Sequence, residues 1–376
     1  VGQATGEDQA KDSSRKLATG CLYPVLHDGG DLYVVSEGKG LSRYKWRGTL
    51  ALQTEVAAHH DIHIAEDIYT LTMLPGTYRY NGHDMKFAVD YITVLDRQGK
   101  VKRDINLLTA IAGTGALKEQ IDKYISQILL KYLFLLKSEQ AAANGKVGDD
   151  DEIGALVGDE VVLKAINDNP KKSLDEIVNK EMAAQGTTLE KLLVQFNNRD
   201  HPEHLLHVNS LEIAGRALPP HIKAGDALIS MKNLDAIAAI DLKKNKSVWH
   251  WGIGRIQGQH HPSVLDNGNI LLFDNGSRRM HSSILELSPS SGDVVWQYGE
   301  GKSSRFFSKE QGGVQKLPNG NLLITESQSG RAFEITREGE IVWEFFCPDQ
   351  DKEKKQRRGI YRMTRVERDF VEKANQ

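Results

Sequence analysis

The chain has 376 residues, of which 39% are hydrophobic and 26% are charged, and its formal net charge is −3. This length is too great for one ordinary core, but it suits a ring of modules that each have a small core. The charge leaves no basic surface for nucleic acid, and no apolar run is long enough to span a bilayer. Neither a nucleic-acid partner nor a transmembrane segment is therefore expected.

The first hundred residues predict a flexible start followed by two four-stranded units. Residues 1–20 are polar and indicate a flexible N-terminal segment. Residues 22–56 form one unit, with a Gly-Gly turn between its first two strands, and residues 59–104 form the next.

Residues 105–204 interrupt the β pattern and predict an α-helical insertion. Apolar residues recur at helical spacing over residues 117–140. Two shorter helices are predicted before residue 200, the first with Ser173 as its N-cap and Glu176 completing a capping box. The insertion is either a packing elaboration on the side of the fold or a lid over its site, and its apolar helix is compatible with contact at a membrane surface.

The chain after this insertion repeats one pattern of four strands and tight turns. The repeats span residues 205–252, 260–300 and 311–347. Trp249, Trp296 and Trp343 stand near the end of each repeat, at an interval of 47 residues. A period of this length with four strands per repeat is typical of β-propeller blades.

The predicted fold is therefore an all-β β-propeller with five complete blades, a partial sixth and an inserted α-helical segment. Residues 21–376 make up the propeller apart from the insertion, and a strand over residues 359–366 is expected to close the ring against the N-terminal strands. In a propeller, the starts of the innermost strands meet at the mouth of the central channel. Side chains at those positions are the candidates for chemistry.

The chain has only two cysteines, Cys21 and Cys347. They are too few for a zinc ribbon or a disulfide framework, and they form no CxxC redox pair. They form one disulfide if the first and last blades meet in space, and otherwise remain two free thiols. Cysteine usage therefore does not fix the cellular compartment.

Histidine clusters stand at the starts of three predicted inner strands. They are His59, His60 and His63 in AAHHDIHI, His207 with Asn209 in LLHVNSLEI, and His260 with His261 in GQHHPSVL. A single histidine is usually structural, but three clusters in register at blade starts indicate one axial site. Lys232 follows Asn209 by one hairpin and would bring a positive charge to the same place.

These residue types favour group transfer through a covalent histidine. Neutral imidazole is a nucleophile and a proton carrier near pH 7, and an Asn amide donates to a developing oxyanion. The Lys232 ammonium would neutralise a tetrahedral anion such as a sulfuryl or phosphoryl group. Two alternatives use the same residues: a transition-metal site that Asp61 joins, or a polar binding pocket without catalysis.

Several segments together resemble the arylsulfate sulfotransferase (arylsulfotransferase) family. They are HHDIH, HVNS, ALISMKNLDAIAAID, QHHPSVLDNGNILLFDNG, GGVQKLPNGNLLITES and IYRMTRV, and the fourth is long and specific. The resemblance covers about residues 20–110 and 205–370, and the helical insertion lies outside it. It implies a propeller, usually six-bladed, that moves a sulfuryl group from an aryl sulfate to a phenol without a nucleotide donor or other cofactor.

The resemblance also implies roles for particular residues. His260 matches the family's nucleophile, and His207 and Asn209 match its His-x-Asn pair. Either His59 or His60 matches a further catalytic histidine. The family's Arg on the strand after His-x-Asn falls at Lys232, which keeps the charge but loses the planar two-pronged donor geometry of a guanidinium.

Small-molecule aryl sulfates and phenols are the partners that this resemblance implies. Bacterial members of the family are exported, so a periplasmic or extracellular location is expected. The competing classes of function are a non-catalytic propeller that binds a ligand or protein at the channel mouth and a His-ligated metal enzyme.

Overall fold

The computed structural model describes residues 22–27, 30–143, 159–169, 171–199, 202–301, 305–351 and 356–374. The N-terminal segment expected to be flexible lies outside these ranges, as does Cys21. Cys347 is a free thiol.

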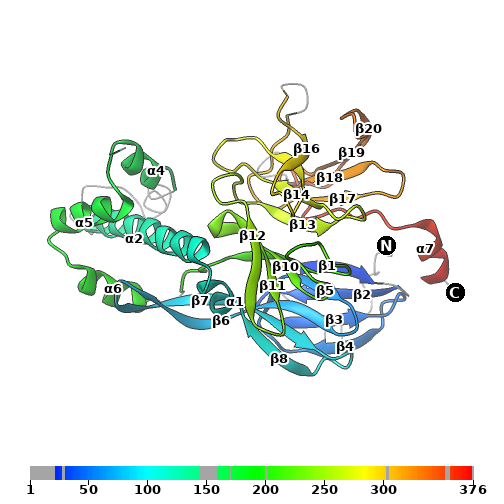
Figure 1. Cartoon of the computed structure of the whole chain (residues 1–376), viewed down its shortest axis with the longest axis horizontal. Helices are drawn as coiled ribbons and strands as arrows, with labels where there is room; N and C mark the ends of the chain where they lie inside the picture. The colour runs from blue at the N-terminus through cyan, green and yellow to red at the C-terminus, as the bar shows by residue number, and fades with distance from the viewer. Residues whose placement is uncertain are drawn as a thin grey trace.

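Five sheets of four antiparallel strands, each hydrogen-bonded in chain order, make up most of the fold (Figure 1). Blade one comprises β1 (Leu22–His27), β2 (Asp31–Ser36), β3 (Gly40–Tyr44) and β4 (Leu50–Thr54). Blade two comprises β5 (Ala58–Ile64), β6 (Ile68–Tyr80), β7 (His83–Leu95) and β8 (Val101–Asn106). Blade three comprises β9 (Val208–Ile213), β10 (Ala227–Met231), β11 (Ala236–Asp241) and β12 (Lys246–Trp251). Blade four comprises β13 (His260–Val264), β14 (Ile270–Asp274), β15 (Ser283–Leu287) and β16 (Val294–Tyr298). Blade five comprises β17 (Gly313–Lys316), β18 (Leu322–Glu326), β19 (Arg331–Ile335) and β20 (Ile341–Phe346).

The predicted β-propeller with five complete blades is confirmed. The first strands β1, β5, β9, β13 and β17 lie innermost, and each contacts the next along the chain. Apolar side chains fill the spaces between neighbouring blades, such as Phe273 of blade four against Phe333 of blade five. Because successive blades are joined in this way, their inner strands are held at fixed places near the centre.

Helices occupy the chain between β8 and β9. They are α1 (Leu107–Ala112), α2 (Gly115–Ala143), α4 (Asp159–Asn167), α5 (Leu174–Ala184) and α6 (Leu189–Asn197). The predicted capping box is present, because the Ser173 hydroxyl accepts from the Glu176 N–H while the Glu176 carboxylate accepts from the Ser173 N–H. The acidic stretch before α4 lies outside the described residues.

The long β6–β7 hairpin extends from the ring and carries these helices (Figure 1). The Tyr78 hydroxyl donates to Asp122 of α2 at 2.7 Å, and the Tyr80 hydroxyl donates to Asp175 of α5 at 3.0 Å. The helices share one apolar core with blades two and three, which is the arrangement of a packing elaboration on the side of the ring. Helix α2 also contacts the short 3₁₀ helix η2 (Lys232–Leu234), so the insertion buttresses the segment that carries Lys232.

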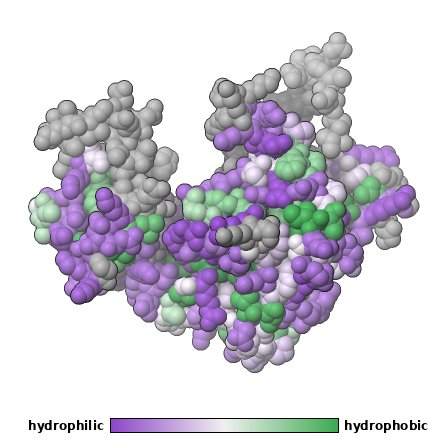
Figure 2. All heavy atoms as spheres, turned by 90° about the horizontal axis from the view of Figure 1, so that it is seen from above, coloured by the Kyte–Doolittle hydropathy of each residue, from purple (hydrophilic) through white to green (hydrophobic). Residues whose placement is uncertain are grey.

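Hydrophilic side chains predominate on the visible face of this helical lobe (Figure 2). Within the described ranges, none of the helices combines the length and the apolarity that crossing a bilayer requires.

The C-terminal part differs from prediction. A two-stranded sheet of β21 (Gln350–Asp351) and β22 (Gln356–Arg357) follows blade five, and α7 (Arg368–Ala374) ends the described chain. The strand expected over residues 359–366 is wrong, because no strand forms there. Its backbone makes one backbone bond, from the Ile360 N–H to the Ser327 carbonyl, and then bonds side chains. The Met363 N–H donates to the Thr325 hydroxyl at 2.9 Å, and the Arg365 N–H donates to the Gln315 amide oxygen at 2.8 Å.

The same polar contact joins blade four to blade five and blade five to the C-terminal segment. The buried Glu286 accepts from the side chains of Asn267 and Asn269 in its own blade, and from Arg337 of blade five at 2.5 Å. Blade five repeats the arrangement. There Glu334 accepts from Asn319 and Asn321, and Arg365 of the C-terminal segment supplies the guanidinium. In each of these two blades, the asparagines at the Asn-Gly turn therefore donate hydrogen bonds to a buried carboxylate.

We expect Glu286→Ala to lower the free energy of unfolding by about 2 kcal/mol, because it removes a buried carboxylate that accepts from two side-chain amides and a half-buried guanidinium. Chemical denaturation of the full chain measures this. The matched control is Glu338→Ala, whose side chain is exposed and should change stability by less than about 0.5 kcal/mol. Equal losses in the two variants would show that the buried carboxylate contributes nothing specific.

Candidate functional site

Four inner strands begin with the same unusual backbone conformation. His60, His207, His261 and Gln311 have φ values of 54°, 51°, 52° and 59°, in the left-handed region. The sheet register shifts at this point in β5, β9 and β13. Non-glycine residues rarely adopt this conformation, and it concentrates at functional sites. The kinks place equivalent residues of blades two to five around one centre, where His59 and His260 each directly precede the kinked residue.

The ring of His260 is oriented by acceptors on one side only. Its Nδ1 lies 2.8 Å from Asn275 Oδ1 and 3.0 Å from the Gly258 carbonyl oxygen. The Asn275 amide is itself oriented, because its Nδ2 donates to the carbonyls of Ser308 and Gln311. Two acceptors require the proton on Nδ1, so the lone pair of neutral His260 is on Nε2.

Asn209 supports the strand that carries His260. Its Nδ2 donates to the Gln259 carbonyl at 2.9 Å, and its Oδ1 accepts from the Ser210 hydroxyl at 3.3 Å. The Asn209 side chain is fully buried. One of its two amide hydrogens is therefore committed to positioning the backbone next to His260, and the other is available to a bound group.

The other predicted histidines form one cluster with a residue that the sequence did not single out. The rings of His60 and His207 have centroids 5.0 Å apart, and His207 stacks on His204 at 4.7 Å. His59 Nδ1 lies 2.8 Å from His60 Nδ1. The structure thus brings together imidazoles from blade two and from the segment that leads into blade three.

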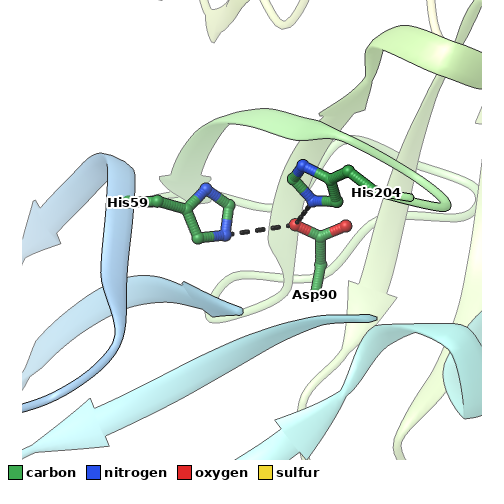
Figure 3. A group of neighbouring side chains, drawn as sticks. All are labelled: His59, Asp90 and His204. Carbon is green, nitrogen blue, oxygen red and sulfur yellow. Dashed lines mark hydrogen bonds and ion pairs between the residues drawn. The ribbon is translucent and has the colours of Figure 1, made fainter. Parts of the chain in front are cut away.

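Asp90 of β7 lies between two of these rings (Figure 3). Its Oδ1 is 2.7 Å from His204 Nε2 and 3.1 Å from His59 Nε2. Burial opposes ionisation of Asp90, but pairing with His204 and His59 outweighs burial and holds the pKa of the carboxyl below its usual range. Asp90 therefore carries a negative charge in the interior.

Two cations reach the same region from opposite directions. The Lys232 ammonium, on η2, lies 3.6 Å from the Glu310 carboxylate at the start of blade five. Arg362, in the C-terminal segment, lies 3.4 Å from Asp61 through Nη1, and its Nε and Nη2 are buried without a hydrogen-bond partner among the described residues.

Asp61 does not join a metal site with the adjacent histidines. Its Oδ1 accepts from the Ile62 N–H and pairs with Arg362, and its Oδ2 accepts from the Leu211 N–H at 3.1 Å. The carboxylate is used to join blades two and three and to hold Arg362. Within the part of the chain that the structure describes, the group of potential metal ligands is His59, Asp90 and His204.

Burial keeps the central imidazoles neutral. It lowers the pKa of His260 to about 3; the hydrogen bond to Asn275 opposes the shift, and the charges of Lys232 and Arg362 add to it. Burial likewise lowers the pKa of His60 and of His207, each with help from neighbouring histidines. These rings can accept protons or donate lone pairs, but they hold a proton poorly.

Sequence reasoning missed Asp90, His204, Asn275 and Arg362. Asn275 lies in the FDNGS segment and Arg362 in IYRMTRV, and both segments contribute to the family resemblance. The sequence therefore pointed to these two segments, but it gave neither residue a role. Asp90 lies in the middle of a long strand, and nothing in the local pattern distinguishes it from an ordinary solvated carboxylate.

A groove of about 600 Å³ lies beside blade five. It is lined by Gln311, Gln328, Asp351, Gln356, Arg357, Arg358 and Gly359. The groove does not include the imidazoles, but Gln311 connects the two, because its carbonyl accepts from the Asn275 side chain that orients His260.

Comparison with protein families gives one match. A family model described as arylsulfotransferase (ASST) matches residues 146–347, which is more than half of the chain. His207, Asn209, Lys232 and His260 lie inside the matched region, whereas His59, His60 and Arg362 lie outside it. A comparison with curated proteins gives no match.

Solved structures resemble the chain only loosely. A protein of unknown function from Bacteroides caccae is 18% identical, with a TM-score of 0.27, over 39% of this chain and 48% of its own, so the match spans about half of that protein's length. Virginiamycin B lyase from Staphylococcus aureus is 10% identical, with a TM-score of 0.39, over 87% of this chain and 70% of its own. BamB from Moraxella catarrhalis is 9% identical, with a TM-score of 0.35, over 93% and 79%. These likenesses do not bear on function.

The buried neutral His260 predicts a loss of stability in acid. Its folded pKa lies below the value of 6.5 for an unhindered histidine. Above pH 6.5, His260 is unprotonated in both the folded and the unfolded state. Below pH 6.5, His260 binds a proton in the unfolded chain but not in the folded chain. Stability should therefore fall as the pH drops from 6.5 toward 3, by about 1.4 kcal/mol per pH unit for this group.

Denaturation of the full chain at several pH values between 6.5 and 4.5 measures this slope. His260→Gln should flatten the slope, and the exposed His83→Gln should leave it unchanged. Parallel slopes for the wild type and His260→Gln would mean that His260 is protonated in the folded state.

Proposed function

The chain belongs to the arylsulfotransferase (ASST) family, and we propose that it transfers a sulfuryl group from an aryl sulfate to a phenolic acceptor through a sulfohistidine at His260. The supporting observation is the fixed tautomer of His260, whose Nδ1 faces two acceptors and whose Nε2 therefore carries a lone pair. Burial keeps that lone pair unprotonated across the neutral and mildly acidic range. A buried, oriented, neutral imidazole is what nucleophilic catalysis by histidine requires.

In the first half-reaction, His260 Nε2 attacks the sulfur of the aryl sulfate. An N–S bond forms, the bond from sulfur to the aryl oxygen breaks, and the phenolate leaves with the electron pair of that bond. In the second half-reaction, the oxygen of the acceptor phenol attacks the same sulfur and the N–S bond breaks. The acceptor's proton passes to His207 or His60, and the two steps give ping-pong kinetics.

The same burial favours donors that release an acidic phenol. Because His60 and His207 have lowered pKa values, their protonated forms are hardly populated near neutral pH. They therefore accept a proton from the acceptor only transiently, and they rarely carry a proton to give to the leaving phenolate. A phenolate that is stable as an anion, such as 4-nitrophenolate, needs little protonation. Electron-poor aryl sulfates are therefore the donors that this site suits best.

We assign two cations and one amide to the binding of the sulfuryl oxygens. Lys232 supplies a point charge, and the second amide hydrogen of Asn209 supplies a neutral donor. Arg362 supplies a planar pair of donors, Nε and Nη2, that are buried without a partner. Arg362 thus provides the two-pronged geometry that is lost when Lys232 stands in place of the family's Arg.

The groove beside blade five is a route for the anionic donor. Arg357 and Arg358 line it, and its volume of about 600 Å³ lies within the range of small-molecule sites.

Incubation with 4-nitrophenyl sulfate and phenol tests the nucleophile. The wild type should release nitrophenol, and His260→Ala should release less than about one-thousandth as much, because the covalent route is lost. Mass spectrometry of the donor-treated protein, without acceptor, should find a sulfuryl adduct on the peptide that contains His260. The control is His221→Ala, which removes an exposed imidazole; undiminished release from His260→Ala would exclude this mechanism.

Arg362→Lys tests the guanidinium separately. It keeps the positive charge but removes the planar donor pair, so kcat/KM for 4-nitrophenyl sulfate should fall by about 100-fold. The fall should be in kcat more than in KM, because the sulfuryl oxygens gain charge in the transition state. Arg368→Lys, at an exposed position on α7, is the control. Unchanged kinetics in Arg362→Lys would remove Arg362 from the site.

A further inference from the structure

Two imidazoles and one carboxylate form a potential metal site with three protein ligands. They belong to His59, His204 and Asp90. The three ligand atoms lie within 4.8 Å of one another (Figure 3). Zinc binds imidazole nitrogen and carboxylate oxygen at about 2.0–2.2 Å, which separates neighbouring ligand atoms by about 3.3 Å in a tetrahedral site. The observed separations of 3.1 Å and 2.7 Å to Asp90 Oδ1 need only a small expansion to admit the ion.

Two atoms of this group are buried with no hydrogen-bond partner among the described residues. They are His59 Nε2 and Asp90 Oδ2. The contact of His59 Nε2 with Asp90 Oδ1 is short, but it lacks the geometry of a hydrogen bond. Asp90 is fully buried and His59 is 1% exposed. Leaving a ring nitrogen and a charged carboxylate poorly satisfied in the interior is costly. A cation bound by His59 Nε2 and the Asp90 carboxylate would give the nitrogen a partner and offset the carboxylate's charge.

The ligands stand on three segments that are already held together without an ion. The Ala88 N–H donates to the Glu203 carbonyl at 2.8 Å, and the Leu205 N–H donates to the Ala88 carbonyl at 3.1 Å. These bonds fix the loop that carries His204 alongside β7, which carries Asp90. The Asn233 side chain also donates to the His204 carbonyl at 2.8 Å. His59 is on β5 of the same sheet, which pairs with β6, and β6 pairs with β7. Backbone hydrogen bonds therefore hold all three ligand-bearing segments together.

The surroundings also meet the requirements of a metal site. The second ring nitrogen of His59 has a partner, because its Nδ1 lies 2.8 Å from His60 Nδ1, and such outer contacts orient metal-bound histidines. The His204 side chain is 17% exposed, which leaves an approach for the ion and a fourth position for water.

We infer that His59, Asp90 and His204 bind a divalent first-row transition ion, with zinc as the best match to two imidazoles and one carboxylate. Hard cations such as magnesium and calcium take sites built wholly from oxygen, so this nitrogen-rich set excludes them. The ion would neutralise Asp90 and fix His59 with its Nδ1–H directed at His60. It is separate from the nucleophile, since the ring contacts of His260 go to Asn275 and Gly258.

Zinc binding to the full chain tests the inference directly. The protein is stripped with a chelator, dialysed against Zn²⁺ and analysed for metal, and it should retain about one ion per chain. Asp90→Asn and His204→Gln should weaken retention by more than about 100-fold. His63→Gln changes a histidine of the same strand β5 outside the ligand set and should retain the ion. Magnesium in place of zinc should not be retained.

Cobalt substitution in the wild type gives a measurement that does not depend on whether the variants fold. A Co²⁺-loaded chain should show the visible absorption of a low-symmetry nitrogen–oxygen site, and zinc should displace it. A wild type that binds neither ion above the level of Asp90→Asn would overturn the inference.

The outcome is independent of sulfuryl transfer. His260→Ala should retain zinc while losing transfer, because His260 lies outside the ligand set. A chain that releases nitrophenol but binds no zinc would leave the proposed function intact while removing the metal site.

Discussion

The left-handed backbone at the start of four inner strands is the constraint on which the site depends. A regular strand would send successive side chains to opposite faces of its sheet. The kinks at His60, His207 and His261 break that alternation, and two neighbouring residues can then both face the centre. In this way His59 and His60 come to touch each other as well as rings from the next blade. β-branched residues would be strained at these positions, whereas His and Gln tolerate them better.

Desolvation then decides the chemistry of the gathered rings. Several imidazoles share the centre, and for His60, His207 and His260 burial is the largest cause of a lowered pKa. Charge in this region comes instead from Asp90, Lys232 and Arg362. The arrangement separates lone pairs from fixed charges: neutral nitrogens are available for bond formation, and cations surround the place where an anion would develop. The carboxylate of Asp90 stands apart, among the rings on the side of blades two and three.

Much of the frame of this site could be predicted from sequence, because its signals are local. The 47-residue interval of Trp249, Trp296 and Trp343 is a property of one blade, and so is the Asn-Gly turn at Asn267. The capping box at Ser173 lies within one helical turn. Histidines at blade starts could be grouped because the fold itself dictates where those starts meet.

The rest could not be predicted, because it depends on contacts between distant parts of the chain. Asp90 meets His204 across 114 residues, and Arg362 meets Asp61 across 301. Residues 359–366 have the apolar and β-branched pattern of a strand, and that local signal led to the wrong prediction. In the structure the segment finds side-chain partners such as Thr325, and the described residues form no sixth four-stranded sheet beside it.

That C-terminal segment joins ring closure to completion of the site. Arg365 bonds Glu334 and lies over the ring of Trp343, just as Arg337 bonds Glu286 and lies over Trp296. The segment thus supplies to blade five the contact that blade five supplies to blade four. Three residues earlier, Arg362 reaches Asp61, and the adjoining Tyr361 contacts Tyr23 of blade one. Because one short segment makes both sets of contacts, the guanidinium can be in place only when the last blade is joined to the first.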